Sequence, residues 1–251
     1  MSRKVSVVCD YPFNDTTKWA VTCRVWGLLK YYHPNVTAGH FDWDQVLIDR
    51  LDKINDAVTP EQVNIELMEM IRIAGAYEFS KDTAWNDAMN MNVNLCWLDH
   101  SFINDSIRQT LGEIASLTAT NHWYYIKHKT MDDFNPVCNE KDYNKDVILQ
   151  YEYRLLALFR FWNVIYYFFP YKYLIDQSWD ATLSAFIPQF ITASDFPSYN
   201  SLVVKIAAKL NDGHATVGGL PLKSVAEKYI TLIDSLTIVS KIGRASCRER
   251  V

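Results

Sequence analysis

Apolar side chains recur at helical spacing along two long stretches of the chain. The first covers residues 21–32 and ends at Pro34, and the second covers residues 155–169 and ends at Pro170. Apolar positions three and four residues apart lie on one face of an α-helix, and a proline interrupts the helix that precedes it. Each stretch therefore predicts a buried helix that is followed by a turn.

These two stretches are copies of one unit. Residues 24–34 align without gaps on residues 160–170, and Trp43-Asp44 aligns on Trp179-Asp180, at the single offset of 136 residues that carries residue 24 to residue 160. The identical positions are an arginine, two tryptophans, a tyrosine, a proline and an aspartate. Because tryptophan is rare, these matches at one offset indicate an internal duplication.

Each copy predicts a helix, a proline-containing turn, a second helix that begins at the Trp-Asp pair, and a third helix. The third helix is expected over residues 60–74 in the first copy and residues 196–210 in the second, with Pro60 in a first turn where its missing N–H costs nothing. The predicted fold class is mainly α: two copies of a three-helix unit joined by a partly irregular connector. The expected divisions are an extension (1–16), the first repeat (17–75), the connector (76–150), the second repeat (151–217) and the start of a further segment (218–240).

The connector predicts one helix of its own. Asn104-Asp-Ser106 can cap a helix whose apolar face carries Ile107, Leu111, Ile114 and Leu117. Residues 122–143 predict irregular structure with one short strand. Residues 241–251 differ in composition from everything before them and resemble a translated sequencing-library adapter, so a non-native tail is expected there and the protein is expected to continue past Ser240.

Composition and charge narrow the classes of function. The chain has 251 residues and 49% hydrophobic content, which is compatible with an enzyme or a binding protein. Its net charge is -4 and both signs are mixed along the sequence, so it shows no basic face for nucleic acid. No signal peptide is visible, and the longest apolar stretch, broken by Arg160, falls short of a transmembrane helix. The five cysteines form no Cys-x-x-Cys pair and are expected to be small buried hydrophobes.

The most informative motif follows the third helix of the second copy: Leu-Asn-Asp212-Gly213-His214-Ala215-Thr-Val. At the equivalent place the first copy has Ala-Gly-Ala-Tyr-Glu78, so the copies differ there. One interpretation is that Gly213 caps the helix between two solvated neighbours. The other is that His214, held by a rigid turn, acts as a general base, since an imidazole accepts and returns a proton near neutral pH.

The aromatic helix, the Tyr-Phe-Phe-Pro-Tyr turn, the Trp-Asp helix start and the Asp-Gly-His motif together resemble the helical region ahead of the catalytic core in C-terminal-processing (tail-specific) serine peptidases. The first copy, with Val25-Trp-Gly-Leu-Leu-Lys-Tyr-Tyr-His-Pro and Phe41-Asp-Trp-Asp, is similar to the duplicated front end of a Bacteroidetes branch of that family. The resemblance covers residues 17–217.

This resemblance implies that a PDZ-like domain and an α/β core with the nucleophilic serine follow the motif. In tricorn-core-like members the His of this motif is the base, whereas other members use a Ser/Lys dyad. Ala215 stands where the family usually has threonine, which removes a hydroxyl and leaves His214 in place. The resemblance also implies a protein or peptide substrate and a location in the periplasm or cell envelope. The nucleophilic serine of the family's core is expected outside this sequence, so the chain alone is expected to be inactive.

Other candidates are weaker. His33 aligns with Phe169, which favours a ring packed at a turn over a metal ligand, and His122 and His128 do not have the spacing of two ligands on one helix face. Asp44 and Asp180 are expected to be helix caps or favourable charges at helix starts. No cofactor or metal site is expected. The competing hypotheses are a non-catalytic helical module that binds a protein or peptide through its aromatic surface, and glycan binding by exposed Trp and Tyr rings.

Overall fold

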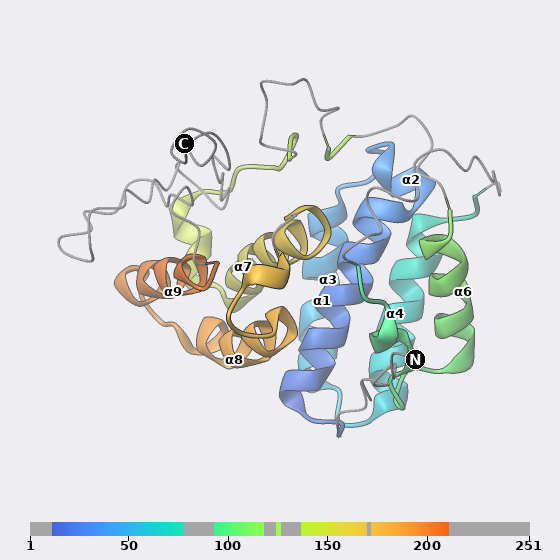
Figure 1. The fold of residues 1–251 in the computed structure, drawn as a ribbon, viewed down its shortest axis with the longest axis horizontal. Coiled ribbons are helices and arrows are strands. Elements are labelled where there is room, and N and C mark those ends of the chain that lie inside the picture. The colour runs from blue at the N-terminus through green and yellow to red at the C-terminus, as the bar shows by residue number, and fades with distance from the viewer. Residues whose placement is uncertain (1–11, 78–92, 118–123, 127–136, 170–171, 211–251) are drawn as a thin grey trace, which may run out of the picture. The chain divides into compact units, whose positions relative to one another are not determined.

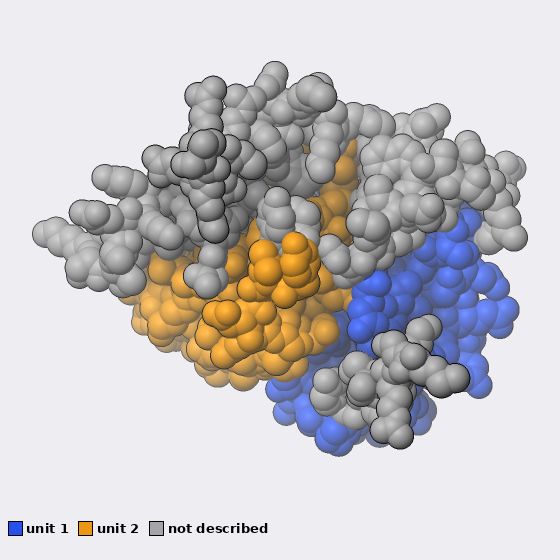
Figure 2. Space-filling model, viewed as in Figure 1, with its two compact units in different colours: residues 1–122 blue, residues 123–251 orange. Residues whose placement is uncertain are grey.

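The computed structural model describes residues 12–77, 93–117, 124–126, 137–169 and 172–210, and these residues are mainly helical (Figure 1). Eight α-helices and three short 3-10 helices (η1 to η3) lie in the described ranges. The prediction of a mainly α fold is therefore confirmed. The chain divides into two compact units, residues 1–122 and residues 123–251, which Figure 2 colours separately.

In the first unit the long helix α1 lies beside α3, α4 and α6 (Figure 1). Its elements are α1 (Asp15–Tyr32), α2 (Pro34–Thr37), α3 (Trp43–Asp56), α4 (Pro60–Ala74), η1 (Cys96–Asp99) and α6 (Asp105–Ala115). Helices α1 and α4 each begin with a capping box, in which Asn14 or Thr59 exchanges hydrogen bonds with the residue three positions later. Residues 15–32 are buried almost throughout, so α1 forms the core of the unit.

In the second unit α7 packs against α8, and α8 packs against α9. The elements are η2 (Lys145–Leu149), α7 (Tyr151–Phe168), η3 (Lys172–Leu174), α8 (Trp179–Thr192) and α9 (Phe196–Ala208). Helices α7, α8 and α9 stand at the offset of 136 from α1, α3 and α4, so both copies contain the three predicted helices in the predicted order.

The predicted third helix of the first copy has the bounds that the sequence indicated, Pro60–Ala74, whereas that of the second copy ends at Ala208 rather than residue 210. The connector helix is confirmed as α6: its cap, Asn104, accepts a hydrogen bond from the Ile107 N–H at 2.9 Å. In place of the short strand, the described residues of the connector show a single antiparallel bridge between Ile126 and Val137.

Two tryptophans lock the first and second helices of each copy together. In the first copy the Trp26 indole donates to the Trp43 carbonyl at 2.9 Å, and the Trp43 indole donates to the Trp26 carbonyl at 3.1 Å. In the second copy Trp162 and Trp179 repeat this exchange at 2.8 and 3.0 Å. All four side chains are buried. The tryptophans that revealed the duplication therefore hold the first and second helices of each copy together.

A buried cation near the start of the first helix also connects that helix to the second helix of its copy. Lys18 of α1 donates to the carbonyls of Asn55 and Ala57 at 2.6 and 3.1 Å, at the C-terminal end of α3. The offset carries residue 18 to Arg154 of α7, which donates to the Phe190 and Ile191 carbonyls of α8 at 2.7 and 2.8 Å. The last carbonyls of a helix have no partner within it, so a cation there is favourable.

The first turn of the second helix carries an acid, but that acid is not the cap. Asp42 and Ser178 cap α3 and α8, one residue before the tryptophans. The cap interpretation of Asp44 and Asp180 is therefore wrong, and the alternative, a favourable charge in the first turn, is the one that the structure supports. Asp44 is buried and lies 3.8 Å from the Lys30 Nζ.

The cation beside this aspartate comes from different positions in the two copies. In the first copy Lys30 stacks its ammonium over the Trp26 ring at 4.7 Å. In the second copy residue 30 is replaced by Tyr166, and Lys172 of η3 places its Nζ 4.1 Å from the Tyr166 ring and 2.8 Å from the Tyr166 carbonyl oxygen. The environment is thus conserved although the sequence position of the charge is not.

Burial lowers the pKa of Lys172 to about 8, while the nearby Asp180 opposes the shift. Because the unfolded chain binds this proton up to pH 10.5, the free energy of unfolding should rise with pH between about 8 and 10.5, and Lys172→Met should remove that part of the rise. Titration of dimethylated lysines by NMR measures the pKa directly. A Lys172 signal that titrates near 10.5 contradicts this environment.

The cysteines correct one prediction. Cys23 is buried, as expected of a small hydrophobe, but Cys96 is disulfide-bonded and half-buried. Every tryptophan in the described ranges is buried, which is unfavourable for glycan binding by those rings. Within the described ranges, no helix is both long and apolar enough to span a membrane.

Candidate functional site

The predicted site residues Asp212, Gly213 and His214 lie outside the described residues. The structure places the chain as far as Leu210, two residues before Asp212. Leu210 is buried, and its N–H donates to the Ala207 carbonyl at 3.1 Å. The end of α9 is thus anchored in the core of its unit immediately ahead of the motif.

The first copy shows how the equivalent exit from the third helix is held. After α4 the Asn35 side-chain amide donates to the Ala74 and Ala76 carbonyls, both at 2.9 Å. Between them Gly75 has φ of 82°, a left-handed conformation that favours glycine, and a Cβ there would approach the Asn35 amide nitrogen to 3.4 Å. The turn after the first helix therefore fixes the path of the chain beyond the third.

His33 belongs to the same arrangement. Its side chain is fully buried, its Nε2 lies 3.2 Å from the Gly75 carbonyl oxygen, and its ring meets the Tyr77 ring edge-on at 5.1 Å. Burial lowers the pKa of His33 to about 4, so the imidazole is neutral near pH 7. The interpretation as a ring packed at a turn is confirmed. This histidine is structural, and Phe169 occupies the equivalent buried position in the second copy.

The two copies therefore differ in the segment that follows the third helix. The first has an imidazole in the turn at residue 33, where it braces the end of α4. The second has a phenyl ring at residue 169 and carries its imidazole in the exit segment itself, at His214. The sequence comparison identified this divergence, but the bracing role of His33 and Asn35 could not be read from the spacing alone.

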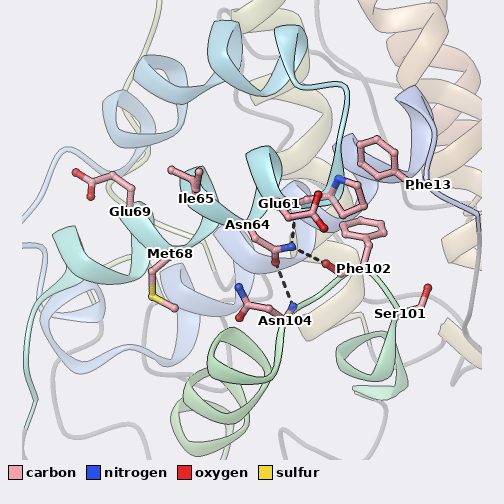
Figure 3. Close-up of a pocket in the computed structure, with 10 residues that line it drawn as sticks. Phe13, Glu61, Asn64, Ile65, Met68, Glu69, Ser101, Phe102 and Asn104 are labelled. Carbon is pink, nitrogen blue, oxygen red and sulfur yellow. Dashed lines mark hydrogen bonds between the residues drawn. The ribbon is translucent and has the colours of Figure 1, made fainter.

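A groove of about 820 Å³ lies on the first unit (Figure 3). It lies between α4 and the segment 101–104. Asn64 ties the two walls together: its amide donates to the Pro60 carbonyl at 2.8 Å and the Phe102 carbonyl at 2.6 Å, and its oxygen accepts from the Asn104 N–H at 3.2 Å. Sequence reasoning missed this groove, although a buried asparagine between the core positions Val63 and Leu67 is the signal that could have indicated it.

The described part of the chain contains no group of three or more His, Cys, Asp or Glu side chains that could hold a metal ion. His122 and His128 lie outside that part. Comparison of the sequence with protein-family models gave no match, and neither did searches of curated proteins and of solved structures.

Proposed function

We propose that this chain is the helical front part of a serine endopeptidase of the C-terminal-processing type, with His214 as the general base. The observation that carries the proposal is the Asp212-Gly213-His214 motif directly after the anchored end of α9 in only one of two otherwise equivalent copies. The other copy uses the same place for a braced turn. Two copies that keep the same core but differ in the segment after the third helix are what we expect when only one copy has gained or retained a function.

The contrast between the two histidines supports this assignment. A general base near neutral pH needs a pKa close to the working pH and access to the nucleophile. His33 is buried with a pKa of about 4, which suits a structural ring and not a base. His214 aligns with Glu78, which follows the third helix in the sequence, and not with His33 in the turn after the first helix, so the packing of His33 gives no reason to expect the same environment for His214.

In the proposed reaction a serine hydroxyl attacks the scissile carbonyl of a peptide while His214 takes its proton. The protonated imidazole then donates to the leaving amine, and a water activated by the same His hydrolyses the acyl-enzyme. The resemblance places the serine in an α/β core beyond this helical part. We expect that core, and not the helical part, to supply the serine and the oxyanion donors.

The test is peptide hydrolysis by the full-length protein with His214→Ala. We expect activity to be abolished while circular dichroism keeps the helical signal, because residue 214 follows the end of α9 in the sequence. His40→Ala is the matched control: His40 is exposed in the described structure, and its loss should leave activity unchanged. Activity retained in His214→Ala would move the base to a lysine of the core.

The second candidate function is a non-catalytic module that binds a protein or peptide. The tryptophans of the duplicated helices are buried, so such a module would have to use other side chains, and Tyr173 and Leu174 of η3 are 69% and 62% exposed. Tyr173→Ala with Leu174→Ser distinguishes the two functions: it should weaken the binding of a protein or peptide partner if the chain is such a module, and leave peptide hydrolysis by the full-length protein unchanged if the chain belongs to a peptidase.

For the compartment we propose the periplasm or cell envelope. The disulfide at Cys96 supports this location, because disulfides persist in oxidising compartments and are rare in the cytosol.

A further inference from the structure

One asparagine recurs in the third helices of the two copies. Residues 60–74 and 196–210 align at the offset of 136, and Asn64 and Asn200 are the only identical pair between them. Buried positions keep their apolar character but differ in residue type, as Leu67 and Val203 do. An identity confined to a polar residue indicates that its side chain has a specific task beyond packing.

In the first copy Asn64 binds a stretch of peptide backbone. Its amide donates to the Phe102 carbonyl at 2.6 Å, and its oxygen accepts from the Asn104 N–H at 3.2 Å (Figure 3). A carboxamide offers donors and an acceptor side by side, so it can pair with a carbonyl and with the N–H two residues later. Phe102 and Ile103, the adjacent apolar residues held in this way, are buried. Asn64 thus acts as a receptor for a backbone segment that carries two apolar side chains.

The equivalent asparagine of the second copy makes no such bond. Asn200 of α9 is half-buried and forms no hydrogen bond within the described residues. Among the described elements α9 packs chiefly against α8, whereas α4 contacts α1, α3 and α6. The carboxamide of Asn200 can therefore accept a backbone segment that the described part of its unit does not supply.

Apolar side chains flank Asn200 along α9. Phe196 and Val204 stand four residues before and after it, so the three lie on one face of the helix. Phe196 is 37% exposed and Val204 is half-buried. From Phe196 to Val204 this face is about 12 Å long, which is the length of about four extended residues. It therefore suits a short peptide that pairs its backbone with Asn200 and places apolar side chains on either side.

The charge beside this face is positive. Lys205 follows Val204, aligns with Glu69 of the first copy, and is exposed. Lys209 is exposed one turn later, and neither lysine forms an ion pair within the described ranges. Charge complementarity therefore favours a peptide that carries an acidic side chain toward the C-terminal end of α9.

We propose that the α9 face of Phe196, Asn200 and Val204 binds a segment of another protein, in which two adjacent apolar residues are followed closely by an acidic one. The Asn200 amide donates to a backbone carbonyl of this segment, and the Asn200 oxygen accepts the N–H two residues later. The sequence 102–105, Phe-Ile-Asn-Asp, has this chemistry and includes the backbone that Asn64 binds, so it supplies the probe. This inference concerns binding by the second unit and does not depend on peptidase activity.

The first test is fluorescence polarisation with a labelled peptide of residues 99–106, Asp-His-Ser-Phe-Ile-Asn-Asp-Ser, titrated with the full chain. We expect binding that Asn200→Ala weakens about tenfold, because two backbone hydrogen bonds are lost while alanine preserves the helix. Ser201→Ala is the matched control, since Ser201 is exposed beside Asn200 and its loss should leave binding unchanged. A peptide that does not bind, or that binds Asn200→Ala equally well, overturns the proposal.

The second test examines the backbone pairing itself. In a variant of the peptide, an ester oxygen replaces the amide N–H at the position of Asn104, so the Asn200 oxygen loses its donor. We expect several-fold weaker binding to the unchanged chain and no further loss in Asn200→Ala. The same ester effect in both chains would show that the N–H does not bind Asn200, and would contradict the assignment.

Exchange of the Asn200 side-chain amide with water, followed by NMR, identifies the occupant. We expect exchange as fast as that of an exposed amide in the protein alone, and slower exchange once the peptide is bound. Slow exchange in the dilute protein alone would identify a segment of the same chain as the occupant. Slow exchange that appears only at high protein concentration would identify a second copy, and either result refutes binding of another protein.

Discussion

Replacing Trp26 by phenylalanine should lower the free energy of unfolding by about 3 kcal/mol, and Trp162→Phe should have a similar effect in the second copy. Each change removes the indole donor that binds the carbonyl of the partner tryptophan, at 2.9 Å in one copy and 2.8 Å in the other. It also leaves space where the larger ring was packed at full burial. Lost hydrogen bonding of about 1 kcal/mol and a cavity term of about 2 kcal/mol make up the effect.

Trp97→Phe is the matched control for this prediction. Trp97 is also buried, but its indole N–H has no hydrogen-bond partner in the described structure, so the same substitution removes an unsatisfied donor. The cavity cost of about 2 kcal/mol still applies, but removal of an unsatisfied buried donor offsets about 1 kcal/mol of it, so we expect a net loss near 1 kcal/mol. Urea denaturation followed by circular dichroism measures all three variants. If Trp26→Phe costs no more than Trp97→Phe, the indole exchange does not stabilise the fold.

Replacing Arg154 by methionine should cost about 4 kcal/mol. The guanidinium donates to the Phe190 and Ile191 carbonyls of α8, and to the Ile148 and Leu149 carbonyls of η2 at 3.0 and 2.6 Å. Methionine keeps most of the packing of the stem but leaves these acceptors without their donor. Each buried group that loses its partner costs about 1 to 3 kcal/mol, and the more exposed carbonyls recover part of this through water.

The first copy supplies a graded version of the same test. Lys18 performs the equivalent role with one ammonium and two carbonyls, so Arg154→Lys should recover roughly half of the stability that methionine loses. Arg72→Met is the control, because Arg72 is 72% exposed and an exposed ion pair such as its pair with Glu69 adds little to stability. Thermal and urea denaturation give the ranking. Equal losses for Arg154→Lys and Arg154→Met would contradict the carbonyl-binding role.

The apolar spacing and the 136-residue offset predicted the helices of both copies, and proline and capping residues gave the bounds of α4. The hydrogen bonds that connect the first and second helices of each copy could not be predicted in this way. Tryptophan at a core position indicates burial, but the exchange of indole and carbonyl hydrogen bonds depends on how closely the backbones approach. Lys18 and Arg154 stand at equivalent positions, yet a cation within an apolar face gives no indication of the carbonyls that it binds.

The candidate site was predicted less completely than the fold. The divergence at His214 is visible in the sequence because the duplication provides an internal comparison. The brace of His33 and Asn35 against the end of α4 is not visible, since it joins residues about 40 positions apart. The disulfide of Cys96 was missed for a related reason: widely separated cysteines show no pattern until the fold brings their segments together.

The central claim is that both copies are the same three-helix unit, joined by the same reciprocal indole bonds. Hydrogen exchange of the indole N–H groups in ¹⁵N-tryptophan-labelled protein tests it most directly, with signals assigned by Trp→Phe variants. The account predicts that the indoles of Trp26, Trp43, Trp162 and Trp179 exchange far more slowly than free tryptophan, because each requires unfolding of its unit. Slow exchange in the first pair with exchange at the rate of free tryptophan in the second would contradict it.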